Sequence, residues 1–391
     1  MSESNGTSAS GIPAVLLLSD GSVFEGVGAG AEGMSAGEVV FNTSMTGYQE
    51  ILTDPSYARQ IVTLTYPHIG NVGCNPQDVE SDGGVKAAGL VIRDLSLLPS
   101  NFRSAVSLDG YLRANKTVGI WGVDTRRLAR LLRDKGSMVG CVAAGKGYVS
   151  DRAAMRQAIE DFGSMVGKDL ALAYSCKEPY EFKEGRWSAA TGYKEDYGES
   201  DDLRLIVAYD FGDKKNILRL LRERGCKVIV APADYPFEKL CELKPDGVML
   251  TNGPGDPAAC SYAIETAKKL IEKKIPTFGI CLGHQILGIA LGGKAVKMKF
   301  GHHGANHPVK ELATGRVLIT SQNHGFMIDK DSLPAAAEVT HVSLFDGSLQ
   351  GFRLKNAPVM TFQGHPEGSP GPRDAAVLFD RFARMVDAAR A

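Results

Sequence analysis

The feature that most constrains the fold is an alternation of strand-like and helix-like segments that begins at residue 203. The short apolar runs lie at 203–208, 227–231, 247–251 and 277–280, and the amphipathic stretches between them lie at 214–224, 236–243 and 258–272. Strands that alternate with helices build a parallel sheet with helices packed on it. Residues 203–391 are therefore predicted to form an α/β domain with an open, mostly parallel sheet and flanking helices.

The first half of the chain is predicted to be a separate, mixed α/β domain, because 391 residues suit two domains or more. Residues 1–12 are polar and small, and we expect a disordered tail there. The N-terminal domain then covers 13–174, with strands expected at 38–41, 61–65 and 89–92 and a helix at 125–135 that Asp124 caps. Residues 175–202 lose all periodicity and are rich in Lys, Glu, Gly, Ser and Tyr, so they are predicted to be a connector.

Composition excludes several classes of partner. The 44 Lys and Arg residues balance 45 Asp and Glu residues, and a net charge of -1 does not attract nucleic acid or an anionic membrane. The apolar runs are too short to span a bilayer, and the N-terminus has no basic, apolar signal sequence. The 7 cysteines show no C-x-x-C spacing. We therefore expect a cytoplasmic protein that binds small molecules or other proteins, with no structural metal.

One cysteine lies where an enzyme places a nucleophile. Cys281 follows the apolar run at 277–280 and precedes a helical segment, with Gly279 and Gly283 two residues to either side. A glycine-flanked turn between a strand and a helix is the geometry that exposes the nucleophile in G-x-S-x-G hydrolases. The positive end of the following helix favours the reactive thiolate. A buried, inert cysteine is the alternative, and a nearby base would exclude it.

The best candidate for that base is His365. It follows a predicted strand at 358–363, within the sequence Gly364-His365-Pro366-Glu367. Residues two apart in an extended chain point the same way, so the Glu367 carboxylate is expected beside the His365 imidazole. A carboxylate there accepts from one ring nitrogen and leaves the other to accept the proton of Cys281. Because strand ends of a parallel sheet meet at one edge, the sequence predicts a Cys-His-Glu triad.

The turn at 252–257, Asn-Gly-Pro-Gly-Asp-Pro, follows another strand of the same sheet. The backbone N–H groups of Gly253 and Leu282 are predicted to form an oxyanion hole. Two other motifs are set aside. Residues 288–295 nearly match a phosphate-binding loop but end in Ala rather than Ser or Thr, and the three histidines within 301–307 lack acidic or thiol ligands for zinc. We expect a packed loop there.

The motifs GICLGHQ at 279–285, GHPE at 364–367 and NGPGDP at 252–257 together resemble the class I (triad) glutamine amidotransferases. In the N-terminal half, EVVFNTSMTGYQE at 38–50, TDPSY at 53–57 and TYPHIGN at 65–71 resemble the small-chain family of carbamoyl-phosphate synthases. The segment FGHHGANHPV at 300–309 does so too. The resemblance covers nearly the whole chain after the first dozen residues.

The resemblance implies a subunit that hydrolyses L-glutamine and passes ammonia to a large subunit. That partner is expected to use ATP and magnesium to make carbamoyl phosphate from bicarbonate for arginine and pyrimidine synthesis, in a heterodimer or a higher oligomer of heterodimers. This chain itself is expected to need no cofactor. The resemblance assigns Cys281 as nucleophile, His365 as acid and base, and Glu367 as its orienting acid. The residues that it assigns to the glutamine site are Ser56, Gly253, Gly255, Leu282, Gln285, Asn323, Gly325 and Phe326.

Two other functions remain open from the sequence. An amidotransferase subunit of another synthase, such as one that makes anthranilate or GMP, has a similar catalytic half, so only the N-terminal motifs argue against it. A non-catalytic interaction subunit that has kept the fold is the second alternative, and the intact Cys281, His365 and Glu367 argue against it.

Overall fold

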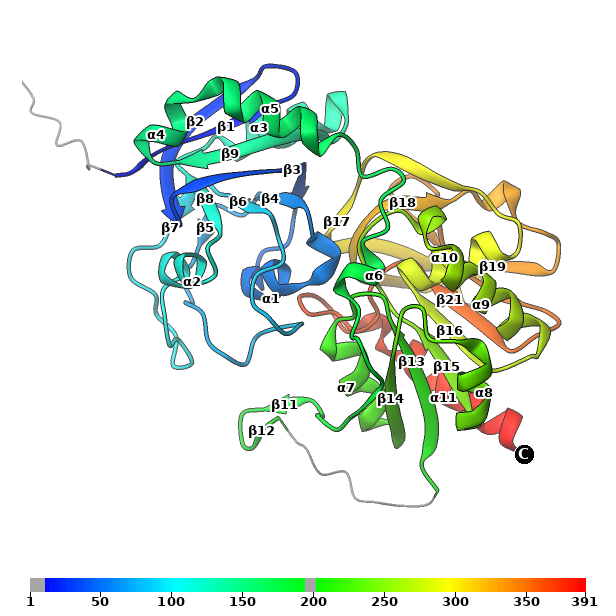
Figure 1. The fold of residues 1–391 in the computed structure, drawn as a ribbon. Coiled ribbons are helices and arrows are strands. Elements are labelled where there is room, and N and C mark those ends of the chain that lie inside the picture. The colour runs from blue at the N-terminus through cyan, green and yellow to red at the C-terminus, as the bar shows by residue number, and fades with distance from the viewer. Residues whose placement is uncertain (1–10, 194–201) are drawn as a thin grey trace, which may run out of the picture.

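A computed structural model describes residues 11–193 and 202–391, and residues 1–10 of the predicted tail lie outside that range. The chain forms two domains that lie side by side (Figure 1). The N-terminal part contains β1 (Pro13–Leu18), β2 (Val23–Gly30), β3 (Gly33–Asn42), α1 (Tyr48–Thr53), η1 (Pro55–Tyr57), β4 (Gln60–Leu64), β5 (His68–Ile69), β6 (Gly89–Val91), β7 (Asp94–Leu95), α2 (Leu108–Ala114), β8 (Val118–Trp121), α3 (Thr125–Lys135), β9 (Met138–Ala144), α4 (Lys146–Ser150), α5 (Arg152–Phe162) and α6 (Ala171–Tyr174).

The N-terminal domain is a closed barrel with the strand order β1-β2-β8-β6-β4-β3-β9. The expected strands at 38–41, 61–65 and 89–92 correspond to β3, β4 and β6, which pair in parallel as β3-β4-β6. Helix α3 begins after Asp124, whose side chain accepts a hydrogen bond from the N–H of Arg127 and so caps the helix. Leu128 and Leu132 of α3 join the core inside the barrel domain. The helical and strand content agrees with a mixed α/β domain.

The C-terminal part contains β13 (Arg204–Asp210), α7 (Lys215–Glu223), β14 (Cys226–Pro232), α8 (Phe237–Leu243), β15 (Gly247–Leu250), η2 (Pro257–Ala259), α9 (Ser261–Glu272), β16 (Thr277–Ile280), α10 (Leu282–Ala290), β17 (Ala295–Glu311), β18 (Val317–Ile328), η3 (Lys330–Ser332), β19 (Ala337–Ser343), β20 (Leu349–Leu354), β21 (Val359–Phe362), η4 (Asp374–Ala376) and α11 (Val377–Arg390). Its sheet has the order β10-β14-β13-β15-β16-β21-β20-β19-β17-β18. The strands from β14 to β21 in that order pair in parallel, as the alternating pattern predicts.

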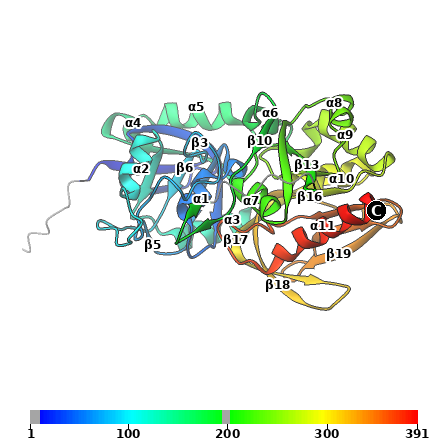
Figure 2. The ribbon, with the colours of Figure 1, turned by 90° about the horizontal axis from the view of Figure 1, so that it is seen from below.

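Helices cover both faces of this sheet. One core packs α8, α9 and α10 against it, and a second core packs α7 and α11 against the other face. In Figure 2 the strands β13 and β16 lie between α8 to α10 on one side and α11 on the other. The carboxyl ends of β13, β15, β16 and β21 therefore open on one crevice, which is where ligands bind in such folds. The α/β fold class is confirmed.

Two parts of this sheet differ from the expected pattern. Strands β17 to β20 extend it as an antiparallel set, and the histidine-rich segment that we expected to be a packed loop is a bulged part of β17, with register shifts between Lys297 and His302 and between Gly304 and His307. Strand β10 (Tyr180–Phe182), from the predicted connector, pairs antiparallel with β14. Antiparallel partners need no crossover helix, so this extension leaves no alternation in the sequence.

Another part of the predicted connector contacts the N-terminal domain. The short hairpin β11 (Trp187–Ser188) and β12 (Gly192–Tyr193) packs on Gln77. The Trp187 indole N–H donates to Gln77 Oε1 at 3.0 Å, and the Tyr193 hydroxyl donates to the Gln77 carbonyl at 2.6 Å. Residues 194–201 of the connector lie outside the described residues. The exact domain borders stay a prediction.

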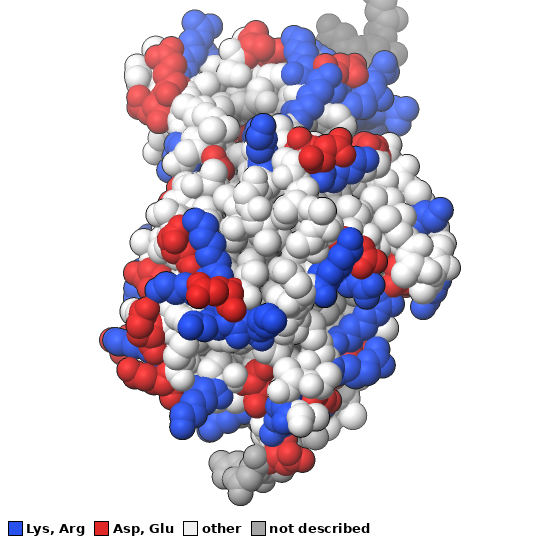
Figure 3. All heavy atoms as spheres, turned by 90° about the vertical axis from the view of Figure 1, so that its right-hand side faces the viewer, with Lys and Arg blue, Asp and Glu red and all other residues white. Residues whose placement is uncertain are grey.

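The distribution of charge on the surface agrees with the balanced numbers of basic and acidic residues. On the face that Figure 3 shows, basic and acidic side chains are interspersed rather than gathered by sign. Among the helices of residues 11–193 and 202–391, none is long and apolar enough to cross a membrane.

Candidate active site

Cys281 lies at a strained turn between β16 and α10. Its backbone has φ 51° and ψ -100°, a conformation that non-glycine residues rarely adopt, and it is the residue that precedes the first helical residue, Leu282. A Cβ on Gly283 would lie 2.1 Å from the carbonyl oxygen of Leu250. The glycine is therefore required because α10 packs directly on β15, whereas the unusual backbone torsion is carried by Cys281 itself.

His365 and Glu367 lie together after the end of β21. The Nδ1 atom of His365 is 2.7 Å from Glu367 Oε1, and the backbone N–H of His365 donates to Ser321. All three triad side chains are buried. The Nε2 atom of His365 has no hydrogen-bond partner in the described part of the chain, although the Cys281 thiol is close enough to raise the pKa of the imidazole. That nitrogen is thus available for a proton transfer with sulfur or substrate.

The thiol itself has other neighbours in this state. Cys281 Sγ lies 3.6 Å from the carbonyl oxygen of Asn323, and the side-chain amide of Gln363 approaches the sulfur at 3.8 Å. Neither the N–H of Leu282 nor that of Gly253 donates a hydrogen bond within the described residues. Two free backbone donors near a nucleophile are what an oxyanion hole requires.

A buried lysine completes the charge distribution around the triad. Lys214 Nζ is 2.9 Å from Glu367 Oε1 and also donates to the carbonyl of Gly368, and the Lys214 and Glu367 side chains are 2% and 0% exposed. Burial alone would raise the pKa of Glu367, but Lys214 and then His365 outweigh it and lower that pKa. Burial would likewise lower the pKa of His365, yet the Glu367 carboxylate and the Cys281 thiol raise it overall. A charged imidazole is therefore stabilised at neutral pH.

The N-terminal domain supplies one wall of the site through η1. The amide of Asn252, in the turn after β15, donates to the Ser56 hydroxyl at 2.9 Å. The amide of Asn323, on β18, reaches Asp54 Oδ2 at 3.2 Å, and Asp54 in turn caps η1. The two domains thus meet at the cavity that Cys281 lines.

The residues expected to bind glutamine converge on one cavity. Ser56, Gly253, Gly255, Gln285, Asn323, Gly325 and Phe326 line the same cavity as Cys281, while Leu282 is not among its lining residues and lies next to the thiol along the chain. The cavity has a volume of about 30 Å³, roughly the room of a single water molecule. Ligand pockets for small molecules are typically on the order of 300 Å³ or more. The cavity beside the nucleophile is therefore narrow.

The turn at 252–257 is held in place by a segment of the N-terminal half. Asp256 accepts a hydrogen bond from the N–H of Gly167 at 2.8 Å, and its own N–H donates to Lys168. Gly255 has φ +99°, and a Cβ there would lie 2.7 Å from the Lys168 carbonyl. Glycine is needed at this position both for its torsion and for the close approach of that backbone.

Sequence reasoning missed several residues of this site, namely Glu38, Asp54, Lys214, Lys297 and Gln363. Lys214 follows the carboxyl end of β13, and Gln363 follows the carboxyl end of β21. Because ligands bind at the carboxyl ends of parallel strands, the position of both residues in the sequence is a signal that could have identified them. Glu38 and Asp54 belong to the other domain, and no local pattern links them to the triad.

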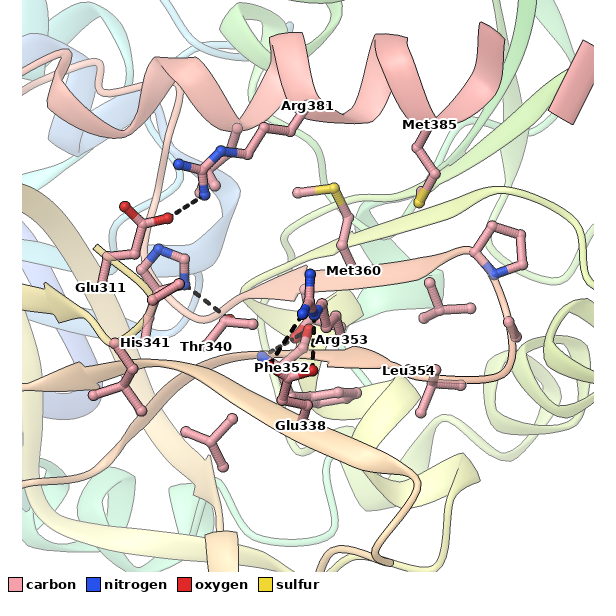
Figure 4. A pocket seen from close by; sticks show the side chains of 18 of the residues that line it. Glu311, Glu338, Thr340, His341, Phe352, Arg353, Leu354, Met360, Arg381 and Met385 are labelled. Carbon is pink, nitrogen blue, oxygen red and sulfur yellow. Dashed lines mark hydrogen bonds and ion pairs between the residues drawn. The ribbon is translucent and has the colours of Figure 1, made fainter. Parts of the chain in front are cut away.

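A larger cavity lies away from the triad, between α11 and the strands β19 to β21 (Figure 4). Its volume is about 680 Å³, and Met360, Met385 and Leu378 line it together with the ion pairs Arg353–Glu338 and Arg381–Glu311. It holds no cysteine among its lining residues and none of the predicted site residues. Size alone therefore does not locate the chemistry in this fold.

Comparison with known proteins agrees with this geometry. The model of the class-I glutamine amidotransferases matches residues 207–385, and the model of the carbamoyl-phosphate synthase small chain, CPSase domain, matches residues 16–142. A Polynucleobacter asymbioticus protein named carbamoyl phosphate synthase small chain is 57% identical over 384 residues, which cover 96% of each chain. The chain belongs to the carbamoyl phosphate synthase small-chain family. Relatives of the same name from Neisseria meningitidis serogroup B and Ralstonia nicotianae are 57% and 58% identical over 378 and 375 residues, and cover 97% and 96% of this chain and 99% and 97% of their own.

Membership of this family confirms the recognised resemblance and the enzyme class, a glutamine amidotransferase subunit of carbamoyl-phosphate synthase. It also decides against a subunit of another synthase, because the match extends through the N-terminal half. In this family the substrate is glutamine and the partner is a large subunit. The roles of the individual site residues remain predictions of the sequence and the geometry.

Proposed function

We propose that this chain hydrolyses L-glutamine to glutamate and ammonia through a thioester on Cys281, and that it delivers the ammonia to a large subunit that uses ATP and magnesium. The observation that carries the proposal is the convergence of a strained, buried cysteine, a His365–Glu367 pair and a wall from the second domain on one narrow cavity. The large subunit would combine the ammonia with bicarbonate into carbamoyl phosphate for arginine and pyrimidine synthesis.

The first half of the reaction forms the thioester. The sulfur of Cys281 attacks the side-chain amide carbon of glutamine, and the N–H groups of Gly253 and Leu282 receive the developing oxyanion. His365 then gives its proton to the amide nitrogen, which leaves as ammonia. The raised pKa of His365 supports this order, because an imidazolium held by Glu367 is ready to act as an acid.

The second half restores the enzyme. His365, now neutral, takes a proton from water, and the resulting hydroxide attacks the thioester carbon. Glutamate leaves and the sulfur of Cys281 is released. Glu367 pairs with the His365 imidazole, so it positions the ring and stabilises its charge. Lys214 pairs with Glu367 and keeps that carboxylate ionised, so it acts through Glu367.

The partner and the compartment follow from the same chemistry. Ammonia that escapes into bulk water becomes ammonium, which is a poor nucleophile, so the proposed reaction requires an enclosed path into the large subunit. We propose a heterodimer, or an oligomer of heterodimers, in the cytoplasm. The 7 cysteines are free, and Cys74, Cys226 and Cys260 are buried without a disulfide, as a reducing compartment allows.

One experiment tests the proposal. The chain is assembled with its large subunit, and carbamoyl phosphate is assayed with glutamine or with ammonium as the nitrogen donor. We expect Cys281→Ser to abolish the glutamine-dependent reaction and to spare the ammonium-dependent one. If both reactions persist, Cys281 is not the nucleophile. If neither occurs with the unmutated chain, the assigned activity is wrong.

A further inference from the structure

A buried histidine with an unused ring nitrogen lines the large cavity between α11 and the strands β19 to β21 (Figure 4). His341, on β19, is 3% exposed. Its Nδ1 atom lies 2.9 Å from the Thr340 hydroxyl, whereas its Nε2 atom has no hydrogen-bond partner among the described residues. A buried polar atom without a partner is unfavourable, so such an atom in the wall of a large cavity indicates a contact that a ligand supplies.

The imidazole of His341 is neutral at neutral pH. Burial lowers its pKa to about 4, while the Glu311 carboxylate opposes this change and Arg381 adds to it. A neutral imidazole has one N–H and one bare nitrogen, and the two tautomers exchange these roles. Whichever role Nδ1 takes with the Thr340 hydroxyl, Nε2 is left with the other. A ligand that offers a donor and an acceptor side by side therefore pairs with either tautomer.

Arg381, on α11, lies at the same end of the cavity as His341 (Figure 4). One of its guanidinium nitrogens donates to Glu311, which also accepts from the Thr314 hydroxyl at 2.6 Å. The other guanidinium nitrogens of Arg381 make no hydrogen bond within the described residues. These N–H donors and His341 Nε2 form a polar end of the cavity, to which the nitrogen or oxygen atoms of a ligand can bind.

The other end of the cavity is apolar and contains two thioethers. Met385 points from α11 toward the strands, Met360 points from β21 toward α11, and Leu378 completes this part of the lining (Figure 4). Thioether sulfur makes favourable contacts with aromatic rings. Arg353, also in the lining, is held by two hydrogen bonds to Glu338 at 3.0 and 3.1 Å, and a guanidinium plane stacks well on an aromatic face. The lining therefore favours an aromatic body.

The size and the charge of the cavity restrict the ligand further. Its volume of about 680 Å³ lies within the range of small-molecule sites, which is on the order of 300–1,000 Å³. The charged residues of its lining form two ion pairs, Arg353–Glu338 and Arg381–Glu311, and leave no net charge. An uncharged ligand therefore fits this lining better than an ion, which would lose its hydration without gaining a free countercharge.

We propose that this cavity is a binding site for an uncharged aromatic heterocycle that carries a donor and an acceptor on one edge. The edge binds His341 Nε2 and the N–H groups of Arg381, and the ring contacts the thioethers of Met360 and Met385. The cavity shares none of its lining residues with the cavity beside Cys281. The ligand therefore does not compete with glutamine, and the inference is independent of the proposed hydrolysis.

Indazole is a suitable probe, because it is an uncharged bicyclic ring with an N–H and a bare nitrogen next to each other. Indene has the same shape without nitrogen atoms, and tetrahydroindazole keeps both nitrogens but has a saturated six-membered ring. Binding to the chain assembled with its large subunit is measured by ligand-observed NMR titration near neutral pH. We expect a dissociation constant of about 1 mM or lower for indazole, and binding about 3- to 10-fold weaker for each analogue.

His341→Phe tests the assigned contact. Phenylalanine has a similar shape but no ring nitrogen, so this variant should bind indene as before and lose the preference for indazole. His307→Phe is the matched control, because His307 is also buried, burial lowers its pKa to about 4, and its Nδ1 has no partner among the described residues. It does not line the cavity, so its replacement should retain the full preference.

Several results would overturn the proposal. If indazole does not bind the assembled complex, or binds no better than indene or tetrahydroindazole, the cavity does not recognise such a heterocycle. Saturating glutamine should leave the affinity for indazole unchanged, and displacement would place the probe in the active site instead. Binding to the isolated chain but not to the complex would show that the large subunit covers the cavity.

A second variant keeps the test decisive if His341→Phe does not fold. Co-elution with the large subunit in size-exclusion chromatography shows which variants fold and assemble. Arg381→Lys keeps a positive charge beside Glu311 but loses the planar set of N–H donors, so it should weaken indazole about 3- to 10-fold and leave indene unchanged. An undiminished preference for indazole over indene in either assembled variant contradicts the proposal.

Discussion

Replacing Lys214 by methionine should strongly destabilise the C-terminal domain, because Lys214 belongs to a buried ion pair. The Lys214 and Glu367 side chains are almost completely buried and 2.9 Å apart. Methionine fills much of the same space but removes the cation that lowers the pKa of Glu367 most, and leaves the carboxylate with only His365 as a charged partner. Removing one partner of a buried ion pair costs about 3–5 kcal/mol. For a domain of this size that corresponds to a fall in Tm of roughly 6–20 °C.

Lys215→Met is the matched control for this measurement. Lys215 is the next residue, it carries the same charge, and it pairs at 2.5 Å with Asp82, whose side chain is 89% exposed. A pair with one such exposed partner contributes about 0–1 kcal/mol. Thermal unfolding of both variants, followed by circular dichroism, should therefore show a large loss for Lys214→Met and a small one for Lys215→Met.

The pH dependence gives a second check with a defined sign. The pKa of Glu367 is lowered in the folded state, so its ionised form stabilises the protein above its unfolded pKa of about 4.3, and this contribution is lost as the pH falls further. The difference in Tm between the unmutated chain and Lys214→Met should thus shrink in acid. If Lys214→Met unfolds within error of Lys215→Met at neutral pH, the buried pair does not have the role that we assign to it.

Two other predictions concern the triad. Gly283→Ala should reduce both stability and glutamine-dependent activity, because the new Cβ would lie 2.1 Å from the Leu250 carbonyl oxygen. We expect the free energy of unfolding, measured with urea, to fall by about 1–3 kcal/mol. An unchanged urea midpoint would contradict the close packing of α10 on β15. His365 has a raised pKa, so the stability that it contributes is fully present below its unfolded pKa of about 6.5 and is lost as the pH rises toward the folded value. The excess stability of the unmutated chain over His365→Asn should therefore decrease between neutral and alkaline pH, and an increase would refute the assigned charge of the imidazole.

Much of the fold is encoded in local patterns, and those parts were predictable. Helix α3, with its cap at Asp124, and strand β16 occur within the expected residues. The rule that ligands bind at the carboxyl ends of parallel strands also brought Cys281 and His365 together, although 83 residues of chain separate them. Both successes rest on periodicity and on topology, which a single sequence displays.

The remaining parts depend on contacts that leave no local signal. The closure of the barrel requires β1 to pair with β9, and the antiparallel set from β17 to β20 has no intervening helices to mark it. Gly283 was correctly expected near the nucleophile but for a different reason, since the strained torsion belongs to Cys281 and the glycine serves close packing. A local motif identifies the residue, whereas only the fold shows which force requires it.

The position of the domain boundary explains why the site uses residues from both halves of the chain. Asp54 accepts from the side chain of Asn323, and the carbonyl of Asn323 faces the sulfur of Cys281. A shift of the barrel relative to the sheet must therefore move groups that contact the nucleophile itself.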